Sequence, residues 1–222
     1  MKIWATILFI CIAGSVCTKT TDHNKQLNTA ENANYLSPLE KEVVHEINLF
    51  RSNPAKYAKD YMVPLAKYYD REILHYPGDV AIKTQEGVNA LNECIRVLSN
   101  VRPLPIMYPN KNLTLAANDH QKDQEKTGKT GHIGKDRSDM KKRIERYGNW
   151  QTRIAENIAY GNSSARQIVI FLLIDDGVKD RGHRNNLLHP AFKIIGVSCG
   201  KHPVYQTMCV MDFAGGITKT EN

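Results

Sequence analysis

The sequence predicts an α+β domain in which helices pack on an antiparallel sheet. Through most of the first two thirds of the 222-residue chain, apolar residues recur at the spacing of amphipathic helices. Two β-like runs separated by a short turn follow near the C-terminus. Helices first and strands later are typical of helices layered on an antiparallel sheet, rather than of alternating βαβ units.

The first 17 residues have the composition of a secretory signal peptide. Lys2 supplies a basic start, residues 3–13 form an apolar run, and Ser15 and Cys17 are small enough to precede a cleavage site after Cys17. The apolar run is shorter than the ~20 residues that cross a bilayer as a helix. We therefore expect a secreted, extracellular protein.

After the signal, residues 18–36 are rich in Thr, Asn and Lys and predict a mobile polar tail. The folded domain is then expected to span residues 37–222 and to begin with a helix. Ser37 is a suitable N-cap for it, and Asn53 followed by Pro54 ends it.

Further segments alternate between helical spacing and loop composition. Each helix is expected to present an apolar side to a common core. The predicted helices are residues 54–61, 86–99, 113–126 and 140–147, with an irregular excursion at 68–84 and a loop at 128–139 that contains His132.

The last third contains the predicted sheet. Residues 165–174 are almost wholly apolar, and periodicity alone does not separate a buried helix from a buried strand there. Residues 194–199 and 205–213 are β-like, and the turn at 200–203 between them predicts an antiparallel hairpin.

The chain has five cysteines. Cys11 and Cys17 fall in the predicted signal, which leaves an odd number in an oxidising compartment. Cys199 and Cys209 lie in the two β-like runs, so we expect them to form a disulfide and Cys94 to be buried and unpaired.

Charge and sequons add two expectations. Asn112 and Asn162 begin N-glycosylation sequons, which matter only if the chain is secreted. The net charge of +7 favours weak attraction to anionic surfaces such as phospholipid headgroups or acidic glycans. The basic residues are scattered among acidic ones and form no stripe, so we expect no nucleic-acid partner.

Several short segments together resemble a known family over roughly residues 37–216. They are Ile47–Arg51, Leu115–His120 followed by His132, Glu156–Ile158, Gly182–Asn186 and Ile195–Val197. In this order they resemble the CAP superfamily, which comprises cysteine-rich secretory, antigen 5 and pathogenesis-related proteins with an SCP-like extracellular domain. The resemblance implies an α-β-α sandwich with an antiparallel sheet between helical layers, and it places residues 165–174 on a helix.

The resemblance also implies a cleft that holds two histidines and two acidic residues and often binds Zn²⁺ or Mg²⁺. His132, Glu156 and His183 match three of these positions. The fourth is usually a glutamate after a helix. Here the helix is followed by Asp175 and then Asp176, so we place the fourth position at Asp175, with Asp176 as second choice.

The chemistry of these residues suits a divalent cation. His132 and His183 are the expected metal ligands, because neutral imidazoles with a carboxylate leave an open water position. The remaining carboxylate is able to orient a histidine through its second ring nitrogen or to act through water, since aspartate is shorter than glutamate.

Other polar residues near these motifs are assigned structural roles. His120 is expected to be partly buried and hydrogen-bonded, and His189 to lie at the surface. Asn157 and Asn185 are expected to hold turns, and Arg184 to pair with one of the neighbouring aspartates, Asp175, Asp176 or Asp180.

Three functions remain open on this basis. The favoured one is a secreted module that binds a hydrophobic small molecule, such as a sterol or fatty acid, or an extracellular partner. The second is a metal-dependent hydrolase or peptidase with Glu156 as general base, although the chain lacks His-Glu-x-x-His and Gly-x-Ser-x-Gly motifs. The third is a structural or effector protein whose cleft is vestigial.

Overall fold

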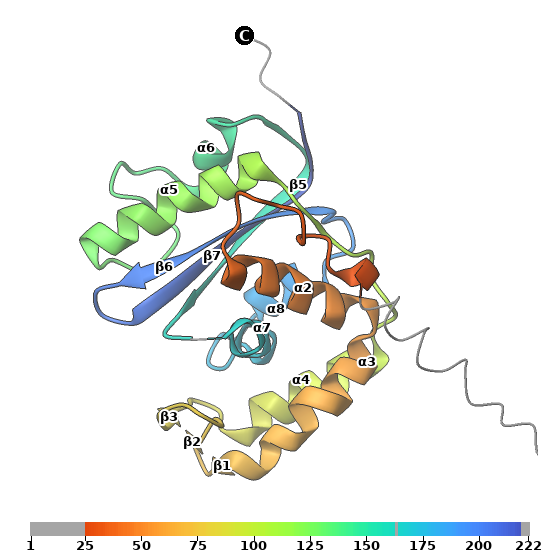
Figure 1. Cartoon of the computed structure of the whole chain (residues 1–222). Helices are drawn as coiled ribbons and strands as arrows, with labels where there is room; N and C mark the ends of the chain where they lie inside the picture. The colour runs from red at the N-terminus through yellow and green to blue at the C-terminus, as the bar shows by residue number, and fades with distance from the viewer. Residues whose placement is uncertain (1–24, 163, 219–222) are drawn as a thin grey trace, which may run out of the picture.

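The structure, a computed structural model, describes residues 25–162 and 164–218 (Figure 1). The predicted signal peptide at 1–17 and the first part of the predicted tail lie outside these residues. Among the helices in the described ranges, none combines the length and the apolar character needed to cross a bilayer.

A four-stranded sheet forms the centre of the fold, in the order β4-β6-β7-β5. Its strands are β4 (Tyr108–Pro109), β6 (Ile194–His202), β7 (Gln206–Thr218) and β5 (Asn149–Tyr160). β5 and β6 both pair antiparallel with β7, and only the two-residue β4 runs parallel to its neighbour. The predicted hairpin is therefore confirmed, and β5 is an edge strand.

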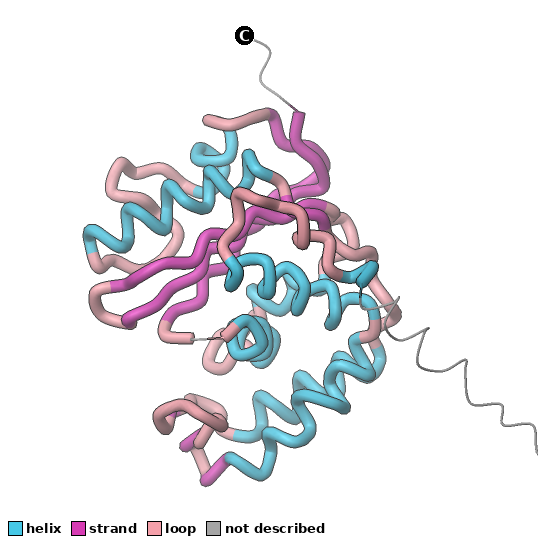
Figure 2. The backbone as a smooth tube through the Cα atoms, in the orientation of Figure 1, coloured by secondary structure: helices cyan, strands magenta, loops and turns pink. Residues whose placement is uncertain are grey.

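Helices cover both faces of this sheet (Figures 1 and 2). One layer contains α5 (Lys111–Thr127) and α6 (Met140–Glu145). The other contains α2 (Pro38–Ser52), α7 (Ala165–Ile174) and α8 (Gly182–Leu188), with the main apolar core between these helices and the sheet. The α-β-α sandwich is therefore confirmed.

A third group of elements lies beyond α7 (Figure 1). It begins with α3 (Pro54–Tyr57), a π-helical turn at 58–62 and a 3₁₀ helix at 63–68. Three short antiparallel strands follow, where the sequence predicts only an irregular excursion. They are β1 (Tyr69–Asp70), β2 (Ile73–Leu74) and β3 (Ile82–Lys83), and α4 (Val88–Asn100) comes after them.

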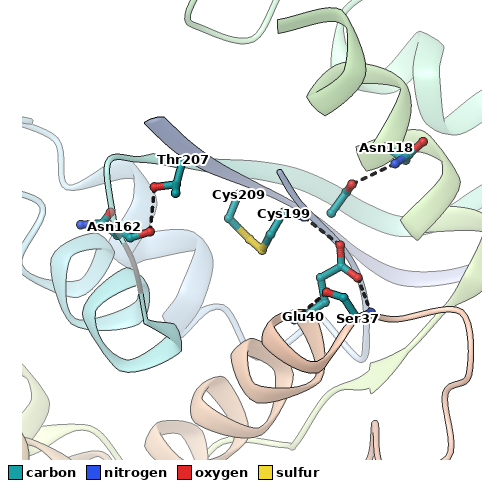
Figure 3. Close-up of a disulfide and its surroundings, with 8 residues drawn as sticks. Ser37, Glu40, Asn118, Asn162, Cys199, Thr207 and Cys209 are labelled. Atoms are coloured by element: carbon teal, nitrogen blue, oxygen red, sulfur yellow. Dashed lines mark hydrogen bonds between the residues drawn. A yellow bond between two sulfur atoms is a disulfide. The ribbon is translucent and has the colours of Figure 1, made fainter. Parts of the chain in front are cut away.

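The start of α2 joins this helix to the sheet. Ser37 and Glu40 form a capping box, in which each side chain accepts a hydrogen bond from the other residue's backbone N–H. The second carboxylate oxygen of Glu40 accepts from the backbone N–H of Cys199 at 2.8 Å (Figure 3). The predicted cap is therefore confirmed, and it also positions α2 on β6.

The prediction of a mobile tail is wrong for residues 25–36. Leu27, Ala30 and Leu36 are buried, and the side-chain amide of Asn48 donates to the backbone oxygen of Leu27 at 3.1 Å. A few well-placed apolar residues and a buried amide hold this stretch against the domain, which overall polarity does not reveal.

Two segments of the last third differ in how well sequence predicts them. Residues 165–174 form a helix, capped by Ser164 at its start and ended by Asp175 in the left-handed conformation. Its mostly apolar composition follows from the burial of most of its residues. β5 was not predicted as a strand, because its polar residues obscure the alternation that its pairing with β7 imposes.

The cysteines are arranged as predicted. Cys199 and Cys209 face each other across β6 and β7 and form a disulfide (Figure 3). Cys94 is buried and unpaired, and its thiol donates to the backbone oxygen of Leu173.

Neither sequon asparagine is fully exposed to solvent, because Asn112 is half-buried and Asn162 is mostly buried. The side-chain amide of Asn112, in the first turn of α5, donates to the backbone oxygen of Tyr147 at 2.8 Å. Glycosylation at either position stays a prediction.

Candidate functional site

The first histidine-carboxylate pair joins the loop after α5 to strand β5. The Nδ1 atom of His132 lies 2.7 Å from Oε1 of Glu156, whose side chain is 2% exposed while that of His132 is 52% exposed. The carboxylate thus fixes the ring through Nδ1 and leaves Nε2 free of this contact.

Arg143 of α6 holds the other side of the same carboxylate. Its Nη2 donates to Oε2 of Glu156 at 2.7 Å, and its Nη1 donates to the backbone oxygens of His132 and Ser138. The guanidinium is itself almost fully buried. One buried arginine therefore positions both the loop that carries His132 and the carboxylate that orients it.

Asp212 of β7 lies directly opposite Glu156 in the β5–β7 register and is fully buried. Burial and the nearby charge of Glu156 raise the pKa of Asp212 well above its ordinary value. Within the described residues, neither oxygen of Asp212 has a hydrogen-bond partner, and burial without a partner favours the neutral carboxyl group.

Glu156 itself behaves in the opposite way. Burial alone would raise its pKa, but the hydrogen bond from His132 and the charge of Arg143 outweigh burial, so the pKa of Glu156 is lowered. The pKa values of these two adjacent buried carboxyl groups are therefore shifted in opposite directions, and the two groups titrate as a pair.

The second pair lies where α7 ends. Asp175 adopts the left-handed conformation there, with φ at 54°, which aspartate tolerates better than most residues. Its Oδ1 lies 2.7 Å from Nδ1 of His183, and its Oδ2 accepts from the backbone N–H of His183 at 2.9 Å. Asp175 therefore both orients this ring and caps the first turn of α8.

Asp176 turns away from this pair. Its carboxylate accepts from the backbone N–H groups of Gln85 and Glu86, just before α4. Of the two aspartates considered for the fourth cleft position, the structure brings Asp175 to His183.

The two pairs lie against opposite faces of β5. Glu156 faces the α5 and α6 layer, whereas the next residue, Asn157, donates to the backbone oxygen of His183 at 3.0 Å on the α8 side. The side chain of Asn186, in α8, donates to Oδ1 of Asn157 at 2.8 Å. The pairs are therefore linked around the free edge of β5.

These contacts do not complete a metal shell. In the part of the chain that the structure describes, no three His, Cys, Asp or Glu side chains lie together as a metal-binding group. A pocket of about 360 Å³ includes His132 and Glu156, while His183 and Asp175 line a different pocket.

This second pocket, which we call the α7 pocket, has a volume of about 270 Å³. It lies between α7, the end of β5 and the short strands β1–β3. Most of its lining is apolar, and its polar lining includes the pair of Asp175 and His183. The apolar side chains are Tyr69, Leu74, Ile82, Ile158, Ala159, Tyr160, Phe171, Leu172, Ile174 and Val178, and the polar lining includes Lys83, Asp175 and Asp176.

Of the remaining predicted residues, His120 and Asn185 have the structural roles expected, whereas the prediction for Asn157 is wrong, because it lies buried within strand β5 and not in a turn. His120 is buried, with Nε2 2.8 Å from the backbone oxygen of Gly131. His189 is half-buried, and Asn185 donates to the backbone oxygen of Asp180.

The prediction for Arg184 is wrong. This side chain pairs with Glu93 of α4 at 2.7 Å and donates to backbone oxygens at the end of α7, not to a neighbouring aspartate. Glu93 is able to pair with Arg184 because α4 packs against α7 in the folded protein.

Sequence reasoning missed Arg143 and Asp212. Asp212 had a signal, since it is the one charged residue in the otherwise apolar run Met208–Phe213, and buried charges are rare without a partner. Arg143 had none, because it stands among other basic residues in a short helix.

Comparison with known proteins identifies the family. The profile of the cysteine-rich secretory protein family, CAP, matches residues 88–213, which is more than half of the chain. The protein therefore belongs to the CAP family. No curated protein matches it in sequence.

The solved structures that match this chain include three bacterial proteins. An extracellular protein with an SCP domain from Bacillus anthracis is 24% identical, covers 56% of this chain and 37% of its own, and has a TM-score of 0.40. An outer surface protein of Borrelia burgdorferi is 17% identical over 58% of this chain and 89% of its own, with a TM-score of 0.42. A cysteine-rich secretory protein of Staphylococcus aureus is 15% identical over 62% of this chain and 42% of its own, with a TM-score of 0.37. The match thus spans less than half of the Bacillus and Staphylococcus chains.

Proposed function

We propose that this protein is a secreted CAP-domain module that binds an apolar small molecule, such as a fatty acid or sterol, in the α7 pocket. The supporting observation is a concave, mostly apolar pocket whose polar lining includes one histidine-carboxylate pair. Pockets of this character are where proteins commonly bind small apolar ligands, with the polar groups fixing orientation.

The lining also suggests how such a ligand lies. Leu74 and Phe171 come from separate elements and provide apolar walls, while Lys83 and His183 provide polar groups. A molecule with an apolar body and one polar end fits this division, because each part meets a matching surface.

Filling the pocket tests this proposal. Ile82→Trp places a larger side chain in the lining and is expected to weaken binding of a fluorescent fatty acid or a labelled sterol about tenfold or more, since overpacking excludes the ligand. Val80→Trp is the matched control, because Val80 lies two residues away, is 76% exposed and does not line the pocket. Equal binding by both variants and the parent protein would place the ligand elsewhere.

We also propose that His132 and His183 hold a divalent cation through their Nε2 atoms. The support is the chemistry of the two pairs, because a histidine that binds metal usually has its other ring nitrogen on a carboxylate. Imidazole donors favour Zn²⁺ over Mg²⁺. A bound cation would add charge and an exchangeable water position beside the α7 pocket. With only two protein donors, we expect binding to be weak.

Calorimetric titration with Zn²⁺ tests the cation proposal. The parent protein is expected to bind one equivalent, and His132→Ala combined with His183→Ala to bind none, because both donors are lost. His45→Ala, on α2, is the control and should leave uptake unchanged. Stoichiometric uptake by the double variant would contradict the assignment.

No observation favours the hydrolase alternative. It requires Glu156 as general base, yet both oxygens of Glu156 are engaged, by His132 and Arg143, and its pKa is lowered. A carboxylate held in this way is a weak base. A vestigial cleft remains the result if neither ligand nor cation binds.

A further inference from the structure

We propose that one corner of the domain docks on anionic phospholipid bilayers. This surface, called here the hairpin-loop surface, consists of residues 128–133 after α5 and residues 201–206 at the turn between β6 and β7. The two segments are far apart in sequence but lie side by side, since Nε2 of His202 is 3.1 Å from the backbone oxygen of Lys129.

Exposed apolar side chains mark this surface. Val204 is 68% exposed, Tyr205 is 46% exposed and Ile133 is 58% exposed. Exposing valine and isoleucine to water is unfavourable, so such side chains are stabilised when a partner buries them. Exposed apolar groups in one region are therefore typical of an interaction site.

The charge of the same two segments indicates an anionic partner. Residues 128–133 and 201–206 contain Lys129 and Lys201 and no aspartate or glutamate, and both lysines are exposed. The nearby carboxylate of Glu125 is paired with Lys122 at 2.7 Å. Apolar tips flanked by lysines fit a bilayer with anionic headgroups, because the tips enter the interface while the ammonium groups meet phosphate and carboxylate.

The surface is held in shape before any partner arrives. His202 is buried, and its Nδ1 accepts from the backbone N–H groups of Val204 and Tyr205, each at 3.2 Å. The hydroxyl of Tyr160 accepts from the backbone N–H of Gly131 at 3.0 Å, and its ring packs against that of Tyr205. Docking therefore requires little ordering of the chain, which lowers its entropic cost.

Vesicle co-sedimentation of the secreted protein tests the proposal. We expect binding to vesicles with about 30% phosphatidylserine in phosphatidylcholine, and little binding to phosphatidylcholine alone, since each lysine near an anionic surface contributes severalfold in affinity. Lys129→Glu with Lys201→Glu, and separately Val204→Ser with Tyr205→Ser, should each weaken binding about tenfold or more.

Two controls keep the outcomes separable. Val80→Ser removes an equally exposed apolar side chain elsewhere and should bind vesicles as the parent does. Ile82→Trp should also bind normally, because the hairpin-loop surface does not depend on the α7 pocket. Equal binding to charged and neutral vesicles overturns the proposal. Undiminished vesicle binding by the variant at Val204 and Tyr205 also overturns it. If the lysine variant in addition loses binding to heparin, the partner is a soluble polyanion.

Discussion

Replacing Arg143 with methionine is expected to lower the free energy of unfolding by about 3–5 kcal/mol, the usual cost of leaving a buried charge without its partner. Glu156 would remain in a nearly water-free position opposite Asp212 with only His132 as a partner. The loop that carries His132 would also lose two hydrogen bonds to its backbone. Urea denaturation followed by circular dichroism measures this change.

A second substitution separates the lost charge pair from lost packing. Adding Glu156→Gln to Arg143→Met removes the stranded charge, so the double variant is expected to recover part of the loss. Lys142→Met changes the exposed neighbouring residue and should shift the unfolding free energy by less than about 0.5 kcal/mol. An Arg143→Met protein as stable as the parent would show that the buried pair is not needed to hold Glu156.

Replacing Arg51 with methionine is expected to destabilise the protein by about 4 kcal/mol or more, because several buried acceptors lose a charged donor at once. Arg51 is fully buried at the end of α2, and within the described residues its side chain donates only to backbone oxygens. The acceptors are Pro105, Leu187, His189 and Phe192. Methionine fills similar space but satisfies none of them.

The consequence should extend to the second histidine. Three of the four acceptors follow His183 along the chain, so losing Arg51 loosens the end of α8 and the segment after it. Thermal unfolding and amide hydrogen exchange of residues 183–192 measure both effects. Arg96→Met, exposed on α4, is the control. Unchanged exchange in the Arg51 variant would show that α8 is held by its other contacts.

Features that depend on local chemistry could be predicted from the sequence. The capping box at Ser37, the end of α2 before Pro54 and the β6–β7 hairpin with its disulfide each depend on residues close together in the chain. Family resemblance added the helix at residues 165–174, where periodicity alone did not separate a helix from a strand.

Features that depend on distant partners could not be predicted in this way. β5 pairs with β7 along most of its length, and the residues of β5 do not by themselves reveal this pairing. Asp212 and Arg143 join the site only after the sheet and α6 come together around Glu156. Residues 25–36 are held to the domain in part by the buried amide of Asn48, which donates to the backbone oxygen of Leu27. The composition of the segment itself does not indicate this contact.

The candidate site lies between these cases. The family resemblance assigned four residues to one cleft. The structure joins them as two pairs, one with partners 24 positions apart in sequence and one with partners 8 positions apart. Only the shorter separation reflects local chemistry, since Asp175 caps the helix that begins with Gly182.

The alternation of β5 also limits how this protein is able to vary during evolution. Glu156 and Asn157 serve opposite faces, so a one-residue insertion or deletion within residues 154–160 would exchange those faces and turn a carboxylate toward the apolar core. Upstream, the register already shifts between Gln151 and Ile154, and such an irregularity is able to absorb a change in length. Natural length variants are therefore expected to accumulate before residue 154 and to be absent from the stretch that follows.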